Sequence, residues 1–124
     1  MINNNSATVY VYKIYGLLIK SQIMMTELVS INQEYSVGCD VTISYGIVPK
    51  VIESAIIKSD SLQLSRAEMY FYIRDVAHYY VCNGETIIVE PEKNSNIKDI
   101  KLYLLGGCLG MLLAQRKVIA IHGG

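Results

Sequence analysis

The feature that most constrains the fold is a long apolar helix predicted near the end of the chain, over Asn96–Gln115. Its apolar residues recur at steps of three and four, and further ones continue the apolar surface around most of the helix. They are Ile97, Ile100, Tyr103, Leu104, Leu105, Cys108, Leu109, Met111, Leu112 and Leu113. The segment that could suggest a membrane span, Leu102–Ala114, is an uncharged run of 13 residues, whereas a membrane-spanning helix needs roughly 20. Such a helix must instead be buried against another element, and we expect that element to be a sheet.

Both ends of this helix carry local signals. Asn96 is expected to cap its start, with Asp99 three residues further on to bond back or to favour the positive helix end. Arg116 and Lys117 are predicted to close it, because cations complement the negative end of a helix dipole. The β-branched and apolar run Val118–Ile121 then predicts a short final strand.

Two glycines interrupt the helix at a four-residue spacing, Gly106 and Gly110. Each costs about 1 kcal/mol of helix propensity relative to alanine. In soluble proteins this spacing usually lets a backbone lie close to a neighbour. We therefore interpret these glycines as the place where the helix approaches the sheet.

The strand signals come before the helix. Runs rich in β-branched and aromatic residues, or with strict alternation, predict strands. They are residues 8–14, 17–21, 40–45, 68–73, 76–82 and 85–90. Residues 24–37 are expected to be a loop, either without regular structure or with one helical turn near Met25, and residues 50–61 suit either a helix or a strand. Asn83-Gly84 favours a type I′ turn because both residues can adopt positive φ, so the last three strands are predicted to form an antiparallel meander. The fold class is therefore α+β: a mostly antiparallel sheet, one long C-terminal apolar helix and a final short strand, in a single domain over residues 1–124.

Composition excludes several functions. The chain has 11 basic and 11 acidic residues, so it lacks the positive charge that nucleic-acid binding uses. We expect neither a nucleic-acid partner nor a membrane. The start of the chain lacks the basic and apolar regions of a signal peptide. Three widely spaced cysteines suit reduced thiols, and we expect a cytoplasmic protein.

Motifs for chemistry are scarce. The sequence contains no GxxxxGK[ST] phosphate loop, no GxGxxG, and no HExxH or CxxC metal motif. No catalytic, cofactor or metal residue is proposed. The candidates for binding are His78, Tyr80 and Arg116. His78 could also be a histidine packed within a strand, and Arg116 could equally stabilise the helix end. Tyr80 belongs to a tyrosine-rich meander of the kind that suits peptide grooves.

The last part of the chain resembles the segment that precedes the phosphate loop in HPr serine kinase-like proteins, including those found beside lasso-type peptide biosynthesis genes. The residues that carry it are Asp99–Arg116 followed by Ile119–Gly123, with Gln115, Arg116, His122 and Gly123 marking the match. The stretches VAHYYVCNGETIIVEP and YVYKIYGLLIKSQI are similar to earlier parts of the family pattern. His122 joins the candidate binding residues on this basis.

The resemblance implies the N-terminal portion of a longer kinase-like protein. ATP and magnesium would belong to a downstream domain, since the match ends before any phosphate loop. We therefore expect a non-catalytic module that positions a peptide substrate or supports assembly, as a homo-oligomer or with a downstream kinase domain. The alternative is a stand-alone interaction or self-association domain that binds a peptide or partner protein.

Overall fold

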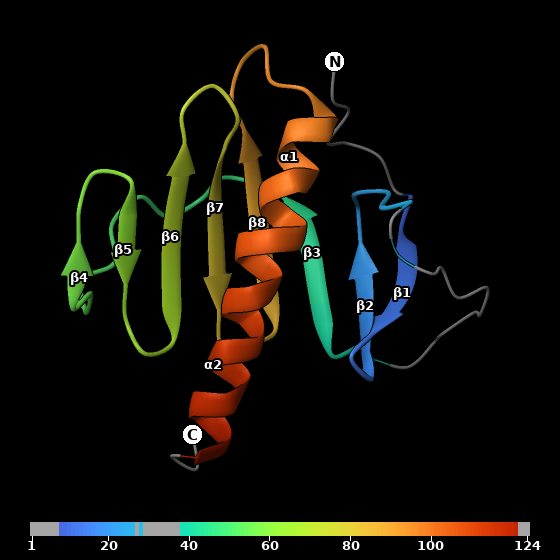
Figure 1. Ribbon diagram of the computed structural model, residues 1–124, viewed down its shortest axis with the longest axis horizontal. Helices are drawn as coiled ribbons and strands as arrows, with labels where there is room; N and C mark the ends of the chain where they lie inside the picture. The colour runs from blue at the N-terminus through green and yellow to red at the C-terminus, as the bar shows by residue number, and fades with distance from the viewer. Residues whose placement is uncertain (1–7, 27, 29–37, 122–124) are drawn as a thin grey trace.

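The computed structural model describes residues 8–26, 28 and 38–121, and shows one open sheet crossed by one helical segment (Figure 1). The strands are β1 (Tyr10–Ile14), β2 (Leu17–Ser21), β3 (Val41–Tyr45), β4 (Ile57–Lys58), β5 (Leu62–Leu64), β6 (Glu68–Ile73), β7 (Ala77–Cys82) and β8 (Thr86–Pro91). The helical segment comprises α1 (Ile97–Tyr103), a π-helical stretch (Leu104–Cys108) and α2 (Leu109–Ile121). The α+β class is therefore observed, with all eight strands in a single sheet.

The strand order is β1-β2-β3-β8-β7-β6-β5-β4. Five of the seven pairings are antiparallel, while β3 is parallel to both of its neighbours, β2 and β8. The predicted meander is formed by β6, β7 and β8. Its second turn has φ of 55° at Asn83 and 64° at Gly84, the positive values that a type I′ turn requires. The segment that suited either a helix or a strand contributes β4, and β5 follows it.

The main core lies between the sheet and the helical segment. In β7, Ala77, Tyr79 and Val81 are buried on this side, and the alternate residues point to the other face. From the helical segment, Ile100, Leu104, Cys108 and Leu112 are completely buried. The Tyr79 hydroxyl donates a hydrogen bond to the Ile100 carbonyl oxygen at 2.8 Å, which satisfies the polar end of a buried ring.

The start of the helix is as predicted, and its end is not. The Asn96 side chain accepts a hydrogen bond from the Asp99 N–H at 2.9 Å. At the other end, α2 continues through Ile121, so the predicted strand over Val118–Ile121 is wrong, and Arg116 and Lys117 lie within the helix. Adding a residue to an existing helix gains a hydrogen bond without a new nucleation cost. This gain outweighs the weak strand preference of four apolar residues.

The interpretation of the two glycines is also wrong. Gly106 and Gly110 are exposed, and a Cβ atom added at either would meet nothing within 4 Å. They lie outside the stripe of fully buried residues formed by Ile100, Leu104, Cys108 and Leu112. Leu102, on the same side, is 64% exposed, so the helix is buried along one stripe rather than on most faces.

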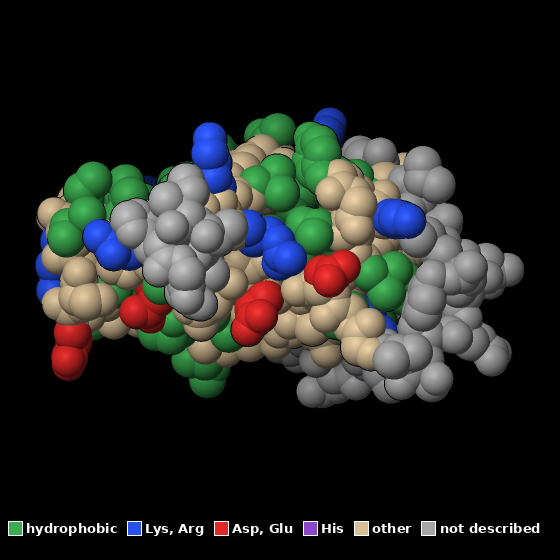
Figure 2. Space-filling model, turned by 90° about the horizontal axis from the view of Figure 1, so that it is seen from below, with side chains coloured by type: hydrophobic (Ala, Val, Ile, Leu, Met, Phe, Trp, Pro, Cys, Tyr) green, Lys and Arg blue, Asp and Glu red, His purple; other side chains and the backbone are tan. Residues whose placement is uncertain are grey.

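The opposite face of the sheet has a smaller core. Val48 and Ile52, in the connection between β3 and β4, pack on Tyr70. The Gln63 side chain holds this connection: its Oε1 accepts from the Ile52 N–H and its Nε2 donates to the Lys50 carbonyl oxygen, both at 2.7 Å. Seen from below, the surface mixes acidic, basic and hydrophobic side chains (Figure 2). In the described part of the chain, no helix is long and apolar enough to cross a membrane.

Candidate functional site

His78 lies in a polar network on the face of the sheet opposite the helix. Its Nδ1 is 2.7 Å from the Tyr70 hydroxyl oxygen, and its Nε2 is 3.6 Å from Oε2 of Glu92. Tyr72 stacks on the His78 ring and donates its hydroxyl to Oε1 of Glu92 at 2.7 Å. Both ring nitrogens of His78 therefore have partners within the chain. This arrangement ties the residues after β8 to the sheet.

Tyr80 is on the same face, and its hydroxyl donates to Oε2 of Glu68. Burial chiefly, together with that hydrogen bond, raises the pKa of Tyr80 well above its usual value. Burial and the nearby Glu90 and Glu92 carboxylates likewise raise the pKa of Tyr70. Because their pKa values are raised, both phenols stay neutral at physiological pH and are not phenolate bases.

Arg116 belongs to a different place, on the helix side of the sheet. Its Nη1 donates to the Gly84 carbonyl oxygen at 2.7 Å. The neighbouring Gln115 accepts from the Gly84 N–H and donates to the Val81 carbonyl oxygen, each at 2.9 Å. These side chains fasten α2 to the β7–β8 turn. The structure therefore does not bring Arg116 together with His78 and Tyr80, and His122 lies outside the described residues.

The feature that the sequence did not reveal is which strands lie at the two edges of the described sheet. The tyrosine-rich strands β6 and β7 are interior, so neither can accept an added strand. The two edges are β1, with five residues, and β4, with two. Long edge strands present unpaired N–H and C=O groups that can pair with another chain, and very short ones limit that risk. Among the described strands, β1 is therefore the edge best suited to binding.

An apolar pocket of about 270 Å³ adjoins this edge on the helix side. Tyr10 and Tyr12 of β1 line it, together with Met24, Met25, Thr26 and Leu28. The Tyr12 hydroxyl accepts a hydrogen bond from the Met25 N–H at 2.7 Å, which holds the methionine segment beside the strand. Met24 is 53% exposed, and methionine adapts readily to different apolar partners.

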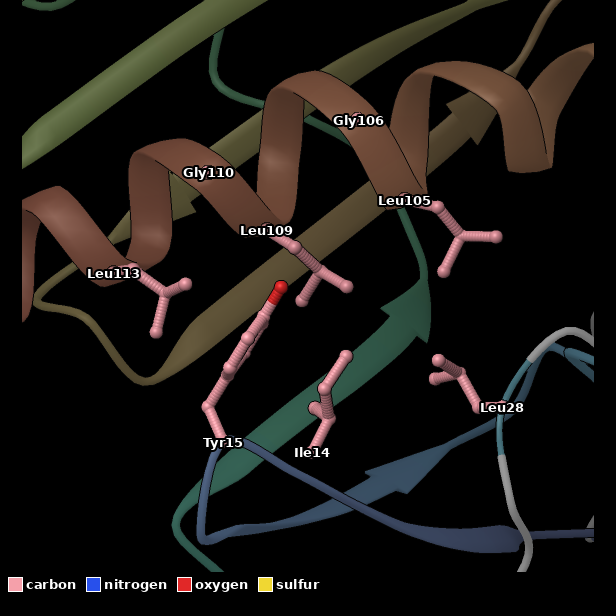
Figure 3. A pocket seen from close by; sticks show the side chains of 8 residues that line it. All are labelled: Ile14, Tyr15, Leu28, Leu105, Gly106, Leu109, Gly110 and Leu113. Atoms are coloured by element: carbon pink, nitrogen blue, oxygen red, sulfur yellow. The ribbon is translucent and has the colours of Figure 1, made fainter.

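A second pocket, of about 340 Å³, lies between the helix and the β1–β2 turn. Ile14, Tyr15 and Leu28 face Leu105, Leu109 and Leu113 across it (Figure 3). Gly106 and Gly110 complete its helix side. Its lining is apolar apart from the Tyr15 hydroxyl and backbone groups. It therefore suits apolar side chains rather than a charged small molecule.

The described residues hold no group of three or more His, Cys, Asp or Glu side chains arranged for a metal ion. Burial raises the pKa of the Cys108 thiol far above its usual value, and burial likewise raises that of Cys82. Neither is an activated nucleophile. Comparisons with models of known protein families, with curated proteins and with solved structures found no match.

Proposed function

We propose that this chain is a non-catalytic binding module that receives an extended peptide along β1. The observation that supports it most is the combination of a five-residue edge strand with an adjoining apolar pocket. In strand addition, backbone hydrogen bonds supply affinity and pockets for alternate side chains supply specificity. Tyr10 and Tyr12 share one face of β1, so a peptide residue beside them would direct its side chain to the pocket of about 270 Å³.

The resemblance to HPr serine kinase-like proteins indicates the kind of protein to which this module would belong. We propose that it forms the N-terminal portion of such a protein and positions a peptide substrate for a downstream domain that uses ATP and magnesium. Three cysteines without disulfide partners are compatible with a cytoplasmic setting. The alternative is self-association, in which β1 pairs with β1 of a second copy. It rests on the same edge strand.

Strand addition has a signature that a displayed peptide library can test. Peptides selected from a random library would be resynthesised with a single N-methyl group at each position in turn. Because alternate residues of an added strand point their N–H groups at the protein, methylation should abolish binding at every second position and be tolerated between them. Selected peptides that tolerate methylation throughout would contradict the proposal.

Matched variants locate the binding edge. Met24→Ala should weaken the selected peptides about tenfold, because an apolar contact worth roughly 1.4 kcal/mol is lost. Ile57→Ala, in β4 at the other edge, is the control and should leave affinity unchanged. Light scattering distinguishes the alternative: a dimer that the peptide dissociates would favour pairing of two β1 strands.

A further inference from the structure

The turn between β1 and β2 determines which backbone groups of β1 point outward. Tyr15 and Gly16 have φ of 52° and 76°, the positive values of a two-residue type I′ turn. In such a hairpin the flanking residues, Ile14 and Leu17, exchange backbone hydrogen bonds, and bonded and non-bonded pairs then alternate along the two strands. Every second residue of β1, counted back from Ile14, therefore bonds β2, and the residues between them direct their N–H and C=O groups outward.

The residues of β1 with outward backbone groups are Val11 and Lys13. Leu18, opposite Lys13, turns its own backbone groups towards β3. Its N–H donates to Oδ2 of Asp40 at 2.8 Å, and its carbonyl oxygen accepts from the Asp40 N–H at 2.9 Å. This is the orientation of a non-hydrogen-bonded pair. Because β1 is the last described strand at its end of the sheet, an added strand would bond Val11 and Lys13 (Figure 1).

The side chains of Val11 and Lys13 lie on the face of the sheet opposite the helix, because Tyr12 between them is buried in the main core. Lys20 of β2 is paired with Val11, so its side chain shares this face and is a diagonal neighbour of Lys13. Lys13 is exposed and Lys20 is half-buried. In the described part of the chain, neither ammonium group forms an ion pair or a hydrogen bond.

An added strand would therefore meet different chemistry on its two faces. Its residues on the helix side would face the apolar pocket of about 270 Å³ beside Tyr10 and Tyr12. Its residues on the other side would face Lys13, with Lys20 one strand further in. Asp40 lies across β2 from Lys13, away from the added strand, and its carboxylate already accepts a backbone hydrogen bond. Opposite charges on neighbouring strands attract, whereas like charges destabilise the pairing.

A second copy of this chain suits the edge less well than an acidic peptide does. Two β1 strands that pair antiparallel continue one sheet, and the same face of each copy lies on the same side. The second copy would therefore bring its own Lys13 and Lys20 beside the first pair. Four lysines would then gather on one face, and their repulsion would oppose the pairing.

We propose that the β1 edge binds an extended peptide in which apolar residues alternate with acidic ones, with the apolar side chains towards the pocket and the acidic ones towards Lys13. This inference rests on the proposed function, because it specifies the peptide that strand addition at β1 would select. Strand addition without a preference for acidic residues would leave the proposed function intact and overturn this inference.

The test uses the full chain and two capped peptides of about eight residues, an ordinary strand length. One alternates valine with glutamate, and the other alternates valine with lysine. Fluorescence anisotropy should show the glutamate peptide binding at least about fivefold more tightly. Lys13→Glu changes an exposed side chain and should reverse that preference. Lys58→Glu, at an exposed lysine of the other edge strand, is the matched control and should leave it unchanged.

A backbone variant separates the acidic preference from strand addition itself. Val11→Pro removes an outward N–H group and keeps Lys13, and proline is tolerated in an edge strand where the N–H faces away from the sheet. It should weaken both peptides about tenfold, because an added strand loses a backbone hydrogen bond. Urea unfolding checks that the variant folds. Where it folds poorly, N-methylation of the glutamate peptide at each position in turn tests the same hydrogen bonds.

Equal affinities for the two peptides, both weakened by Val11→Pro, would overturn the acidic preference and support strand addition. A preference for glutamate that survives Lys13→Glu would also overturn the inference. Binding that neither Val11→Pro nor N-methylation weakens would overturn the inference and the proposed function together. Binding of neither peptide at roughly 1 mM would overturn the inference, and the peptide library described above would then decide the proposed function separately.

Discussion

At the scale of single residues, the glycines of this chain have opposite roles. Gly84 has φ of +64°, and a Cβ atom there would lie 2.5 Å from Cγ of Arg116 and 3.1 Å from its backbone nitrogen. Gly110 has a helical backbone and open space around it. The same substitution by alanine should therefore act in opposite directions.

Gly84→Ala is expected to lower the free energy of unfolding by about 2 kcal/mol, through backbone strain and displacement of α2 from the turn. Gly110→Ala is expected to raise it by about 1 kcal/mol, the difference in helix propensity. Urea unfolding followed by circular dichroism measures both. A stabilising Gly84→Ala would show that α2 does not pack on the turn.

The pH dependence of stability should include a contribution from Glu90. Partial burial raises the pKa of Glu90, but hydrogen bonds from the Lys50 ammonium and the Val48 N–H outweigh it and hold this pKa below its usual value. A carboxyl whose folded pKa is lowered stabilises the fold above its unfolded pKa and loses that contribution as the pH falls through the folded value.

Urea midpoints measured from pH 7 to pH 3 should therefore fall at the acidic end, and they should fall less steeply for Glu90→Gln. Glu53→Gln, at an exposed glutamate in the same connection, is the matched control. Equal slopes for the original chain and Glu90→Gln would contradict the expected contribution.

At the scale of elements, Gln115 is the buried one of the two side chains that fasten α2 to the β7–β8 turn. Gln115 is 2% exposed and bonds both the Gly84 N–H and the Val81 carbonyl oxygen. Gln115→Ala should cost about 2–4 kcal/mol of stability, because two buried backbone groups lose their partner. Lys117→Ala, at an exposed residue two positions further along α2, should change stability by less than about 0.5 kcal/mol. Thermal or urea unfolding compares them, and similar effects for the two would contradict the proposed clamp.

Some elements could be predicted from a short stretch of sequence alone. Asn83-Gly84 and Asn96 act through their own backbone geometry and hydrogen bonds, so a short stretch of sequence predicts them. The alternation in residues 40–45 likewise predicts β3. The end of α2 was not predictable in this way, because a helix already nucleated and packed overrides the preferences of Val118–Ile121.

At the scale of the whole molecule, the proposed function assigns peptide binding to this chain and the use of ATP and magnesium to a downstream domain. Phosphoryl transfer needs a phosphate cradle and metal ligands, and the sequence contains no GxxxxGK[ST] loop. If the proposed function is right, the purified protein should not turn over ATP in the presence of magnesium, as measured by release of inorganic phosphate. Turnover that copurifies with the chain and survives its repurification would contradict this prediction.

The candidate binding residues were likewise predictable from the sequence by type but not by position. The sequence pointed to His78, Tyr80 and Arg116 as residue types able to bind. It could not predict that the first two lie on the opposite side of the sheet from the third. Nor could it predict that β1 is an edge, since this depends on β8 pairing with β3 rather than on any property of β1 itself.

By itself, the sequence determined the parts that depend on neighbouring residues: the strand alternation, the type I′ turn, the capped start of the helix and the α+β class. Only the tertiary structure decided the strand order, the two parallel pairings at β3, the continuation of α2 to Ile121 and the outward direction of Gly106 and Gly110. Local backbone energies act over a few residues, and they set the first group. The second group depends on which distant surfaces bury one another, which no short stretch of sequence records.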